Sequence, residues 1–146
     1  MHFRQLVHSD IEAIARVHQR ACVIAYRFMA WDYTEQAVRD WYTEKFATWD
    51  WGLVAEDRTV VGFVATWVSH LDQLFVDPEH QGEGLGTALL STALARMPLP
   101  VTLNVFEDNA PARRLYERHG FREIDRFLNE TERTVELVYC RDAIGG

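Results

Sequence analysis

Residues 71–86 read LDQLFVDPEHQGEGLG and contain the most specific pattern in the sequence. Apolar residues 74–76 predict a strand, and Asp77-Pro78 predicts its end. Glycines at 82, 84 and 86 predict a tight turn, and apolar residues spaced by three and four from Leu85 onward predict a helix. A helix that starts directly after a glycine turn presents unpaired N–H groups and the positive end of its dipole. We therefore predict that this unit binds an anion such as a phosphate group.

Residue types separate three interpretations of this turn. A nucleoside triphosphate loop needs Gly-Lys followed by Ser or Thr, but Gly86 is followed by Thr87 and the turn has no lysine, which argues against ATP hydrolysis. A dinucleotide loop needs a third glycine three residues after the second, where Thr87 or Leu89 stands, so this option is weakened and stays open. A purely structural glycine turn stays open as well.

The rest of the chain supplies the remaining elements of a mixed fold. Residues 2–7 alternate as a strand does, and Ser9 with Glu12 makes a capping-box pattern before a helix. Further predicted elements are helices over 34–48, 85–97 and 109–120 and strands over 51–56, 60–68, 71–76, 101–105, 121–127 and 134–140. This order predicts an α/β (α+β) fold with an antiparallel front and one strand-helix-strand crossover, in a single domain over residues 1–146.

Composition limits the class of protein and its partners. The 146 residues include 48% hydrophobic and 25% charged side chains, as expected for one globular domain. A net charge of −7 argues against a nucleic-acid partner, because phosphate binding needs a clustered positive face. The sequence has no apolar run near the roughly 20 residues of a membrane helix, and its start does not resemble a signal peptide. We therefore expect a cytoplasmic protein that has no membrane partner.

Cysteines and histidines indicate no metal site. Cys22 and Cys140 form neither a disulfide framework nor a Cys-x-x-Cys pair, and we expect both to be buried. The six histidines are scattered, with no pair at the helical spacing of metal ligands. We therefore expect no bound metal.

The glycine turn resembles that of the GNAT superfamily of N-acetyltransferases, whose signature is Gln/Arg-x-x-Gly-x-Gly/Ala. Residues 81–86, QGEGLG, match this signature, and residues 74–78, LFVDP, are similar to the family's Leu-Tyr-Val-x-Pro strand end. Further matches in order and approximate spacing are Val105, Asn109, Ala112, Leu115-Tyr116 and Gly120-Phe121. The resemblance implies the GNAT fold, a mixed, mostly antiparallel sheet of six to seven strands flanked by about four helices.

The resemblance also implies acetyl-CoA (coenzyme A) as cofactor, bound where two adjacent strands splay apart. Backbone groups of Leu74, Phe75 and Val76 would bond the pantetheine, as an edge strand does. The pyrophosphate would lie against Gln81, Gly82, Glu83, Gly84, Leu85, Gly86 and Thr87. Asn109 would contact the cofactor and Ala112 would leave room for it, although a plain helix cap also explains Asn109. Arg113, Arg114 and Arg118 would either face the adenosine phosphate or form a solvated helix face.

Acetyl transfer to an amine needs a base for the amine and an acid for the departing thiolate. By resemblance Tyr116 lies near the cofactor sulfur, where a phenol of pKa about 10 suits the acid, and the alternative is a core tyrosine. His70 and Asp72 lie two apart on a predicted strand, so both should point to one face. By resemblance this stretch carries the base, which predicts a shared role for His70 and Asp72. The alternatives are an exposed histidine, an aspartate that anchors a cationic substrate, and no residue base at all.

Acceptor choice in this family is set largely by the first two helices and the loop between them, which here are rich in aromatic residues. Trp31 and Tyr33, with Tyr26 before them, are candidates to line a pocket for an amine with an apolar body. Trp41 and Tyr42 instead fall on the apolar stripe of a helix and are predicted to be core. The competing interpretation is that the aromatic patch is a homodimer interface.

The function predicted from these residues is transfer of an acetyl group from acetyl-CoA to a primary amine, in a ternary complex by direct attack. The expected acceptor is a small molecule or amino-acid-like amine. The alternatives are an acetyltransferase for protein N-termini or lysines, and a catalytically weak acyl-CoA-binding regulatory module.

Overall fold

The computed structural model describes residues 1–25 and 33–142, whose strands form one sheet in the order β1-β2-β3-β4-β5-β7-β6. In chain order the elements are β1 (His2–Gln5), α1 (Ile11–Ala25), α2 (Glu35–Phe46), β2 (Trp51–Asp57), β3 (Thr59–Trp67), β4 (His70–Val76), α3 (Leu85–Leu94), β5 (Val101–Phe106), α4 (Ala110–Arg118), β6 (Arg122–Asn129) and β7 (Thr134–Arg141). Strands β4 and β5 are parallel, and every other neighbouring pair is antiparallel. The predicted mixed, mostly antiparallel sheet with four helices is therefore confirmed.

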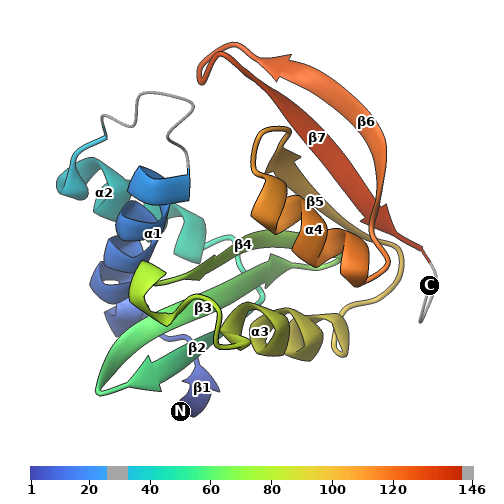
Figure 1. The fold of residues 1–146 in the computed structure, drawn as a ribbon. Coiled ribbons are helices and arrows are strands. Elements are labelled where there is room, and N and C mark those ends of the chain that lie inside the picture. The colour runs from blue at the N-terminus through green and yellow to red at the C-terminus, as the bar shows by residue number, and fades with distance from the viewer. Residues whose placement is uncertain (26–32, 143–146) are drawn as a thin grey trace.

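Helices cover both faces of the sheet (Figure 1). Tyr42 of α2 packs with Phe63 of β3 in the core beneath α1 and α2. Leu89 of α3 packs with Val64 in the core on the opposite face. Neighbouring residues of β3 belong to different cores because side chains alternate across a strand. Each fully buried side chain of this size contributes about 1.5–3 kcal/mol, so the two cores hold the helices firmly against the sheet.

Helix α1 begins through a short 3-10 turn, η1 (His8–Asp10), and Asp10 carries the hydrogen bonds there. Its carboxylate accepts a bond from the backbone N–H of Val7 at 2.9 Å and two bonds from Arg4, each at 2.9 Å. Arg4 also binds Glu56 of β2 at 3.1 Å. The start of the helix is therefore set by Asp10 and Arg4 rather than by the predicted Ser9–Glu12 capping box.

Asp77 anchors the turn between β4 and α3. Its backbone N–H donates to the carbonyl of Val61 at 2.8 Å, and its carboxylate accepts from the N–H of Glu79 at 3.0 Å. The same carboxylate binds Arg20 of α1, with Nε and Oδ2 2.7 Å apart. A second 3-10 turn, η2 (Pro78–His80), follows. The glycine turn therefore starts from a point tied to both the sheet and α1.

Strands β4 and β5 pair at one position only, His70 with Thr102, and separate beyond it. On its other side β4 stays paired with β3 as far as Val76. Within the described residues, the edge of β4 that faces β5 is therefore unpaired after the first residue.

Strand β4 also contains a bulge at Asp72. The register joins Ala65 to Gln73 and Thr66 to Leu71, so Asp72 has no partner on β3. An extra residue in a strand lets two consecutive side chains reach the same face. Accordingly, the Asp72 carboxylate accepts a bond from Trp49, just after α2, while Gln73 is bonded to Tyr42 of α2.

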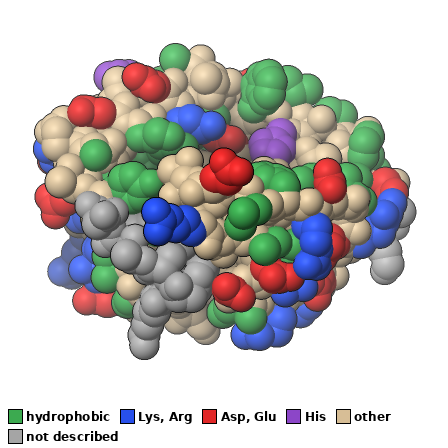
Figure 2. Space-filling view, turned by 90° about the horizontal axis from the view of Figure 1, so that it is seen from above, with side chains coloured by type: hydrophobic (Ala, Val, Ile, Leu, Met, Phe, Trp, Pro, Cys, Tyr) green, Lys and Arg blue, Asp and Glu red, His purple; other side chains and the backbone are tan. Residues whose placement is uncertain are grey.

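The surface on the face in Figure 2 mixes acidic, basic and hydrophobic side chains, and neither sign of charge forms a continuous field there. Cys22 and Cys140 are both buried and unpaired, as predicted. Within residues 1–25 and 33–142, each helix is too short or too polar to cross a membrane.

Candidate active site

A cleft of about 1300 Å³ opens between the diverging strands β4 and β5. It extends from α1 and α2 at one end to the start of α3 and the side of α4 at the other. Of the residues predicted to bind the cofactor, those that line the cleft are Leu74, Phe75, Val76, Gln81, Gly82, Gly84, Leu85, Gly86, Thr87, Asn109, Ala112 and Tyr116. Glu83 is not among the lining residues, and its carboxylate lies 3.1 Å from Nδ1 of His80.

The start of α3 has unpaired N–H groups that face this cleft. Gly84 is the N-cap and supplies no side-chain cap, and the first N–H bonded within the helix is that of Ala88, to the carbonyl of Gly84. The N–H groups of Leu85, Gly86 and Thr87 are therefore available to a ligand. Together with the helix dipole they make a site for an anion, which fits a diphosphate.

Backbone geometry requires two of the three glycines. Gly82 and Gly84 have φ of 83° and 81°, a left-handed conformation that side chains disfavour. A Cβ atom on Gly86 would lie 3.5 Å from Cδ2 of Leu115, which is ordinary contact. The third position therefore admits alanine, in agreement with the Gly/Ala of the signature.

Gln81 closes the turn rather than pointing its amide at a ligand. Its Nε2 donates to the backbone carbonyl of Val76 at 3.1 Å. Leu85 also turns away, since its side chain is buried in the α3 core. Both residues can therefore serve a ligand through their backbone, while their side chains hold the turn together.

Helix α4 places Asn109 and Tyr116 along the other wall of the cleft. The Asn109 side chain caps the helix by accepting a hydrogen bond from the N–H of Ala112 at 3.4 Å. Asn109 therefore both caps α4 and lines the cleft. Tyr116 is 7% exposed, and its hydroxyl makes no hydrogen bond with the residues that the structure describes. Burial raises the pKa of the Tyr116 phenol above its usual 10, so the hydroxyl stays protonated at neutral pH.

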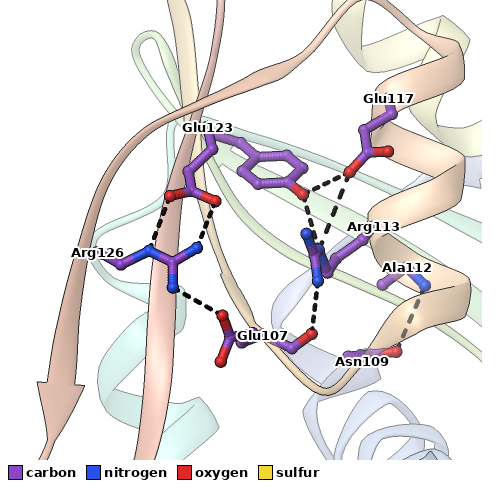
Figure 3. A network of polar contacts seen from close by, with 8 residues as sticks. Glu107, Asn109, Ala112, Arg113, Glu117, Glu123 and Arg126 are labelled. Atoms are coloured by element: carbon purple, nitrogen blue, oxygen red, sulfur yellow. Dashed lines mark hydrogen bonds and ion pairs between the residues drawn. The ribbon is translucent and has the colours of Figure 1, made fainter.

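A polar network holds α4 against β7 and the turn that follows β5 (Figure 3). Arg113 donates to the hydroxyl of Tyr139 at 2.9 Å and to the backbone carbonyl of Glu107 at 3.0 Å. Tyr139 in turn donates to Glu117 at 2.6 Å. Arg113 therefore holds α4 in position. Of the three arginines of α4, Arg113, Arg114 and Arg118, only Arg118 lines the cleft.

His70 and Asp72 both line the cleft, but their surroundings differ. Nδ1 of His70 lies 2.9 Å from Oγ1 of Thr102. Burial lowers the pKa of His70 below its usual 6.5, with a smaller effect of Lys45 in the same direction and of Asp72 against it. Asp72 is held by Nζ of Lys45 at 3.1 Å and by Nε1 of Trp49 at 2.8 Å. His70 is therefore unprotonated at pH 7, while the Asp72 carboxylate already has two partners.

The end of the cleft beside α1 and α2 contains residues that the sequence did not indicate as site residues. Trp41 is 42% exposed and lines the cleft instead of lying in the core. His18 of α1 lines it as well, packed against Phe75 and bonded to Tyr42. A helical stripe of apolar residues therefore does not by itself separate core positions from cleft positions.

Tyr33, one of the residues predicted to bind the acceptor, lines the cleft and contacts a second residue that lines it. Its hydroxyl donates to Oε1 of Glu132, in the turn between β6 and β7, at 2.6 Å. Tyr26 and Trp31, the other two residues predicted to bind the acceptor, lie outside the described residues.

The burial of His18 predicts a pH-dependent stability. Burial lowers the pKa of His18 to about 4. Between pH 6.5 and pH 4, His18 is therefore protonated in the unfolded chain but neutral in the folded chain. We expect the free energy of unfolding to fall by about 3 kcal/mol from this group as pH drops from 6.5 to 4. Urea titrations of wild type and His18→Gln at pH 7 and pH 4.5 measure the effect. A stability difference between the two proteins that does not shrink at low pH would contradict it.

The sequence and structure match known acetyltransferases. Residues 14–121 match the acetyltransferase (GNAT) family. The peptidyl-lysine N-acetyltransferase YjaB of Salmonella typhimurium is 30% identical over 129 residues, which cover 86% of each protein. The spermine/spermidine N(1)-acetyltransferase of Bacillus subtilis is 37% identical over 77 residues, covering 49% of this chain and 48% of that protein. The solution structure of apo YjaB from Escherichia coli has a TM-score of 0.78 and 25% identity, covering 97% of this chain and 98% of that one.

Fold and cleft together thus define an acyltransferase. The chain belongs to the GNAT family of N-acetyltransferases.

Proposed function

We propose that this protein transfers an acetyl group from acetyl-CoA to the primary amine of an amino-acid-like acceptor, by direct attack in a ternary complex within one domain. One observation carries the proposal: a single cleft contains a helix start suited to phosphates, the unpaired edge of β4, a buried phenol and a neutral histidine. When bound, acetyl-CoA would supply the activated acetyl thioester.

The residues present fit this cofactor along its length. The first-turn N–H groups of α3 would bind the diphosphate. The edge of β4 at residues 74–76 would bond the pantetheine amides as an added strand does. Asn109 and Ala112 would flank the cofactor from α4, where a larger residue than alanine would narrow the cleft.

Two side chains are suited to move the protons of the transfer. As the carbon–nitrogen bond forms and the carbon–sulfur bond breaks, the amine must lose a proton and the sulfur must gain one. His70 would take the first proton, because its lowered pKa keeps it unprotonated at pH 7. Tyr116 would give the second, because its raised pKa keeps the phenol protonated until the thiolate forms. Asp72, already bound to Lys45 and Trp49, would hold this end of β4 in place beside His70.

Charge at the acceptor end of the cleft favours a cationic amine. The carboxylates of Glu132 and Glu136 line the cleft, as does that of Asp72, which is paired with Lys45. Among the lining residues that the structure describes, Arg118 is the only arginine or lysine. Such a surface attracts an ammonium group before it is deprotonated. The relatives named as peptidyl-lysine and spermine acetyltransferases act on acceptors of this charge.

Cleft geometry also favours a pocket over a homodimer interface for the aromatic residues near α2. Tyr33 and Trp41 both line the cleft, where aromatic faces can contact the body of an amine by stacking or cation–π interaction. Sedimentation of the protein as a monomer at micromolar concentration would exclude the interface.

Replacing the proposed base tests the chemistry. We expect His70→Gln to lower kcat by about 10²–10⁴-fold while leaving the Kd for acetyl-CoA within about twofold. In the wild type, kcat should fall as pH drops through the His70 pKa, which lies below 6.5, because the protonated imidazole cannot accept a proton. The variant should lack this acidic limb. A full-rate variant, or a variant that keeps the limb, would remove His70 as the base.

A further inference from the structure

A chain of polar side chains leads from α1 through α2 to the bulge of β4. Oη of Tyr42 donates to Oε1 of Gln73 at 3.4 Å, and Nδ1 of His18 is bonded to the same Oη. A hydroxyl has one proton to give, so His18 must be the donor of the second bond. His18 is neutral at pH 7 because burial lowers its pKa to about 4, and its proton is therefore on Nδ1. In this chain, which we call the His18–Tyr42–Gln73 relay, His18 donates to Tyr42 and Tyr42 donates to Gln73.

The relay determines which end of the Gln73 amide faces the cleft. With Oε1 turned toward Tyr42, the two N–H donors of Nε2 are left over. Nε2 makes no hydrogen bond with any described residue, although Gln73 lines the cleft. Since no buried side-chain nitrogen or oxygen in the described part of the chain lacks a partner, Nε2 is open to the cleft and not sealed in the core.

This donor differs in kind from the carboxylates at the acceptor end. The carboxylates of Asp72, Glu132 and Glu136 can only accept hydrogen bonds when ionised. The amide of Asn104, which also lines the cleft, donates one hydrogen bond from Nδ2 to Glu136 at 2.6 Å. An ammonium group satisfies the carboxylates, but it has no lone pair to offer Gln73.

We propose that Gln73 is a specificity-determining residue that donates a hydrogen bond to a carbonyl oxygen of the acceptor. The preferred acceptor is then a primary amine in a molecule that also carries a carbonyl group, as a lysine in a peptide or an amino-acid amide does. An alkyl polyamine has only nitrogen groups and leaves the Nε2 donors unsatisfied, which sites built for hydrogen bonding disfavour strongly. Tyr42 and His18 are positioning residues that act through Gln73. This inference rests on the proposed acetyl transfer.

Gln73→Glu tests the assignment, since it keeps the shape and the acceptor oxygen for Tyr42 and replaces the N–H donors by an anionic oxygen. The acceptors are matched pairs: Nα-acetyl-L-lysine N-methylamide against n-pentylamine, and L-alaninamide against isopropylamine. Each pair shares its amine and differs by the carbonyl-bearing part. In the wild type we expect a higher kcat/KM for the carbonyl-bearing member of one pair. Gln73→Glu should lower that preference at least tenfold.

Tyr42→Phe separates positioning from simple support of the fold. Without the Tyr42 hydroxyl, the Gln73 amide can rotate and exchange the positions of its oxygen and nitrogen. The preference for the carbonyl-bearing acceptor should therefore fall, but by less than in Gln73→Glu. In the double variant the loss should not add to that of Gln73→Glu, because both changes act on one hydrogen bond. A purely structural role for Tyr42 would lower kcat/KM equally for both members of a pair.

The outcomes separate this assignment from the proposed function. If Gln73→Glu changes the kcat/KM ratio within either pair, Gln73 is the residue that binds the carbonyl oxygen. The pair that responds shows whether the acceptor is a lysine side chain or an α-amine. If both proteins acetylate the amines and the kcat/KM ratio is unchanged in both pairs, the role of Gln73 is wrong and the proposed function stands. Loss of acetyl-CoA binding in Gln73→Glu overturns the assignment too, by placing Gln73 in the cofactor site. Failure of the wild type to acetylate any of the four amines overturns the proposed function together with the assignment.

Discussion

Gly84→Asp is expected to weaken acetyl-CoA binding by at least about 100-fold. The new carboxylate would lie at the N-cap of α3, beside the N–H groups of Leu85, Gly86 and Thr87 that are suited to the diphosphate. Juxtaposed like charges cost several kcal/mol, and the carboxylate would also compete for the same donors. Calorimetric titration with acetyl-CoA measures the loss.

Gly84→Asn is the matched control for this variant. Asparagine has nearly the size of aspartate and tolerates the left-handed backbone, φ 81°, but carries no charge. A Cβ atom at this position meets no atom within 4 Å, so both variants should fold. We expect the asparagine variant to lose much less affinity than the aspartate variant. If Gly84→Asp binds acetyl-CoA as the wild type does, the turn is structural and the phosphate assignment is wrong.

Tyr116→Phe is expected to lower kcat by about 10²–10⁴-fold, the usual range for loss of a general acid. The change removes one hydroxyl, which makes no hydrogen bond with the described residues, so little packing is disturbed. The Kd for acetyl-CoA should stay within about twofold. Thiol release under saturating acceptor, with titration of the cofactor in parallel, measures both quantities.

Tyr139→Phe is the control for the loss of kcat expected in Tyr116→Phe. It removes a buried tyrosine hydroxyl of the network in Figure 3, where it donates to Glu117 and accepts from Arg113. We expect it to lower the unfolding temperature more than Tyr116→Phe does, and to lower kcat less. Equal losses of kcat in the two variants would mean that Tyr116 supports the position of α4 and is not the acid.

The local structure at the glycine-turn end of the cleft could be predicted from the sequence because each requirement there constrains a residue type. A left-handed backbone at 82 and 84 calls for glycine, and the end of β4 calls for the hydrogen-bonding Asp77 followed by proline. The helix start at Asn109 likewise needs a capping side chain, and the structure contains it. Requirements of this kind involve only residues close together in the sequence, so they can be recognised in one sequence.

The acceptor end could not be predicted in the same way because it depends on how separate elements meet. The bulge at Asp72 has no residue signature, yet it is what lets Gln73 contact Tyr42. Trp41 was predicted as core from its helical stripe, but the stripe of α2 runs on past the core and into the cleft. His18 follows Ile14 by one helical turn, and a histidine on a buried helix face is a signal that could have indicated it.

The proposed activity requires that the cleft bind acetyl-CoA and that the protein transfer its acetyl group to an amine. Calorimetric titration of the purified protein with acetyl-CoA, followed by a thiol-release assay over small amines, amino-acid amides and lysine peptides, tests it most directly. We expect saturable binding, and thiol release that depends on both acetyl-CoA and a primary amine. Absence of acetyl-CoA binding in the wild type would contradict the account, because the glycine turn would then be no more than a turn.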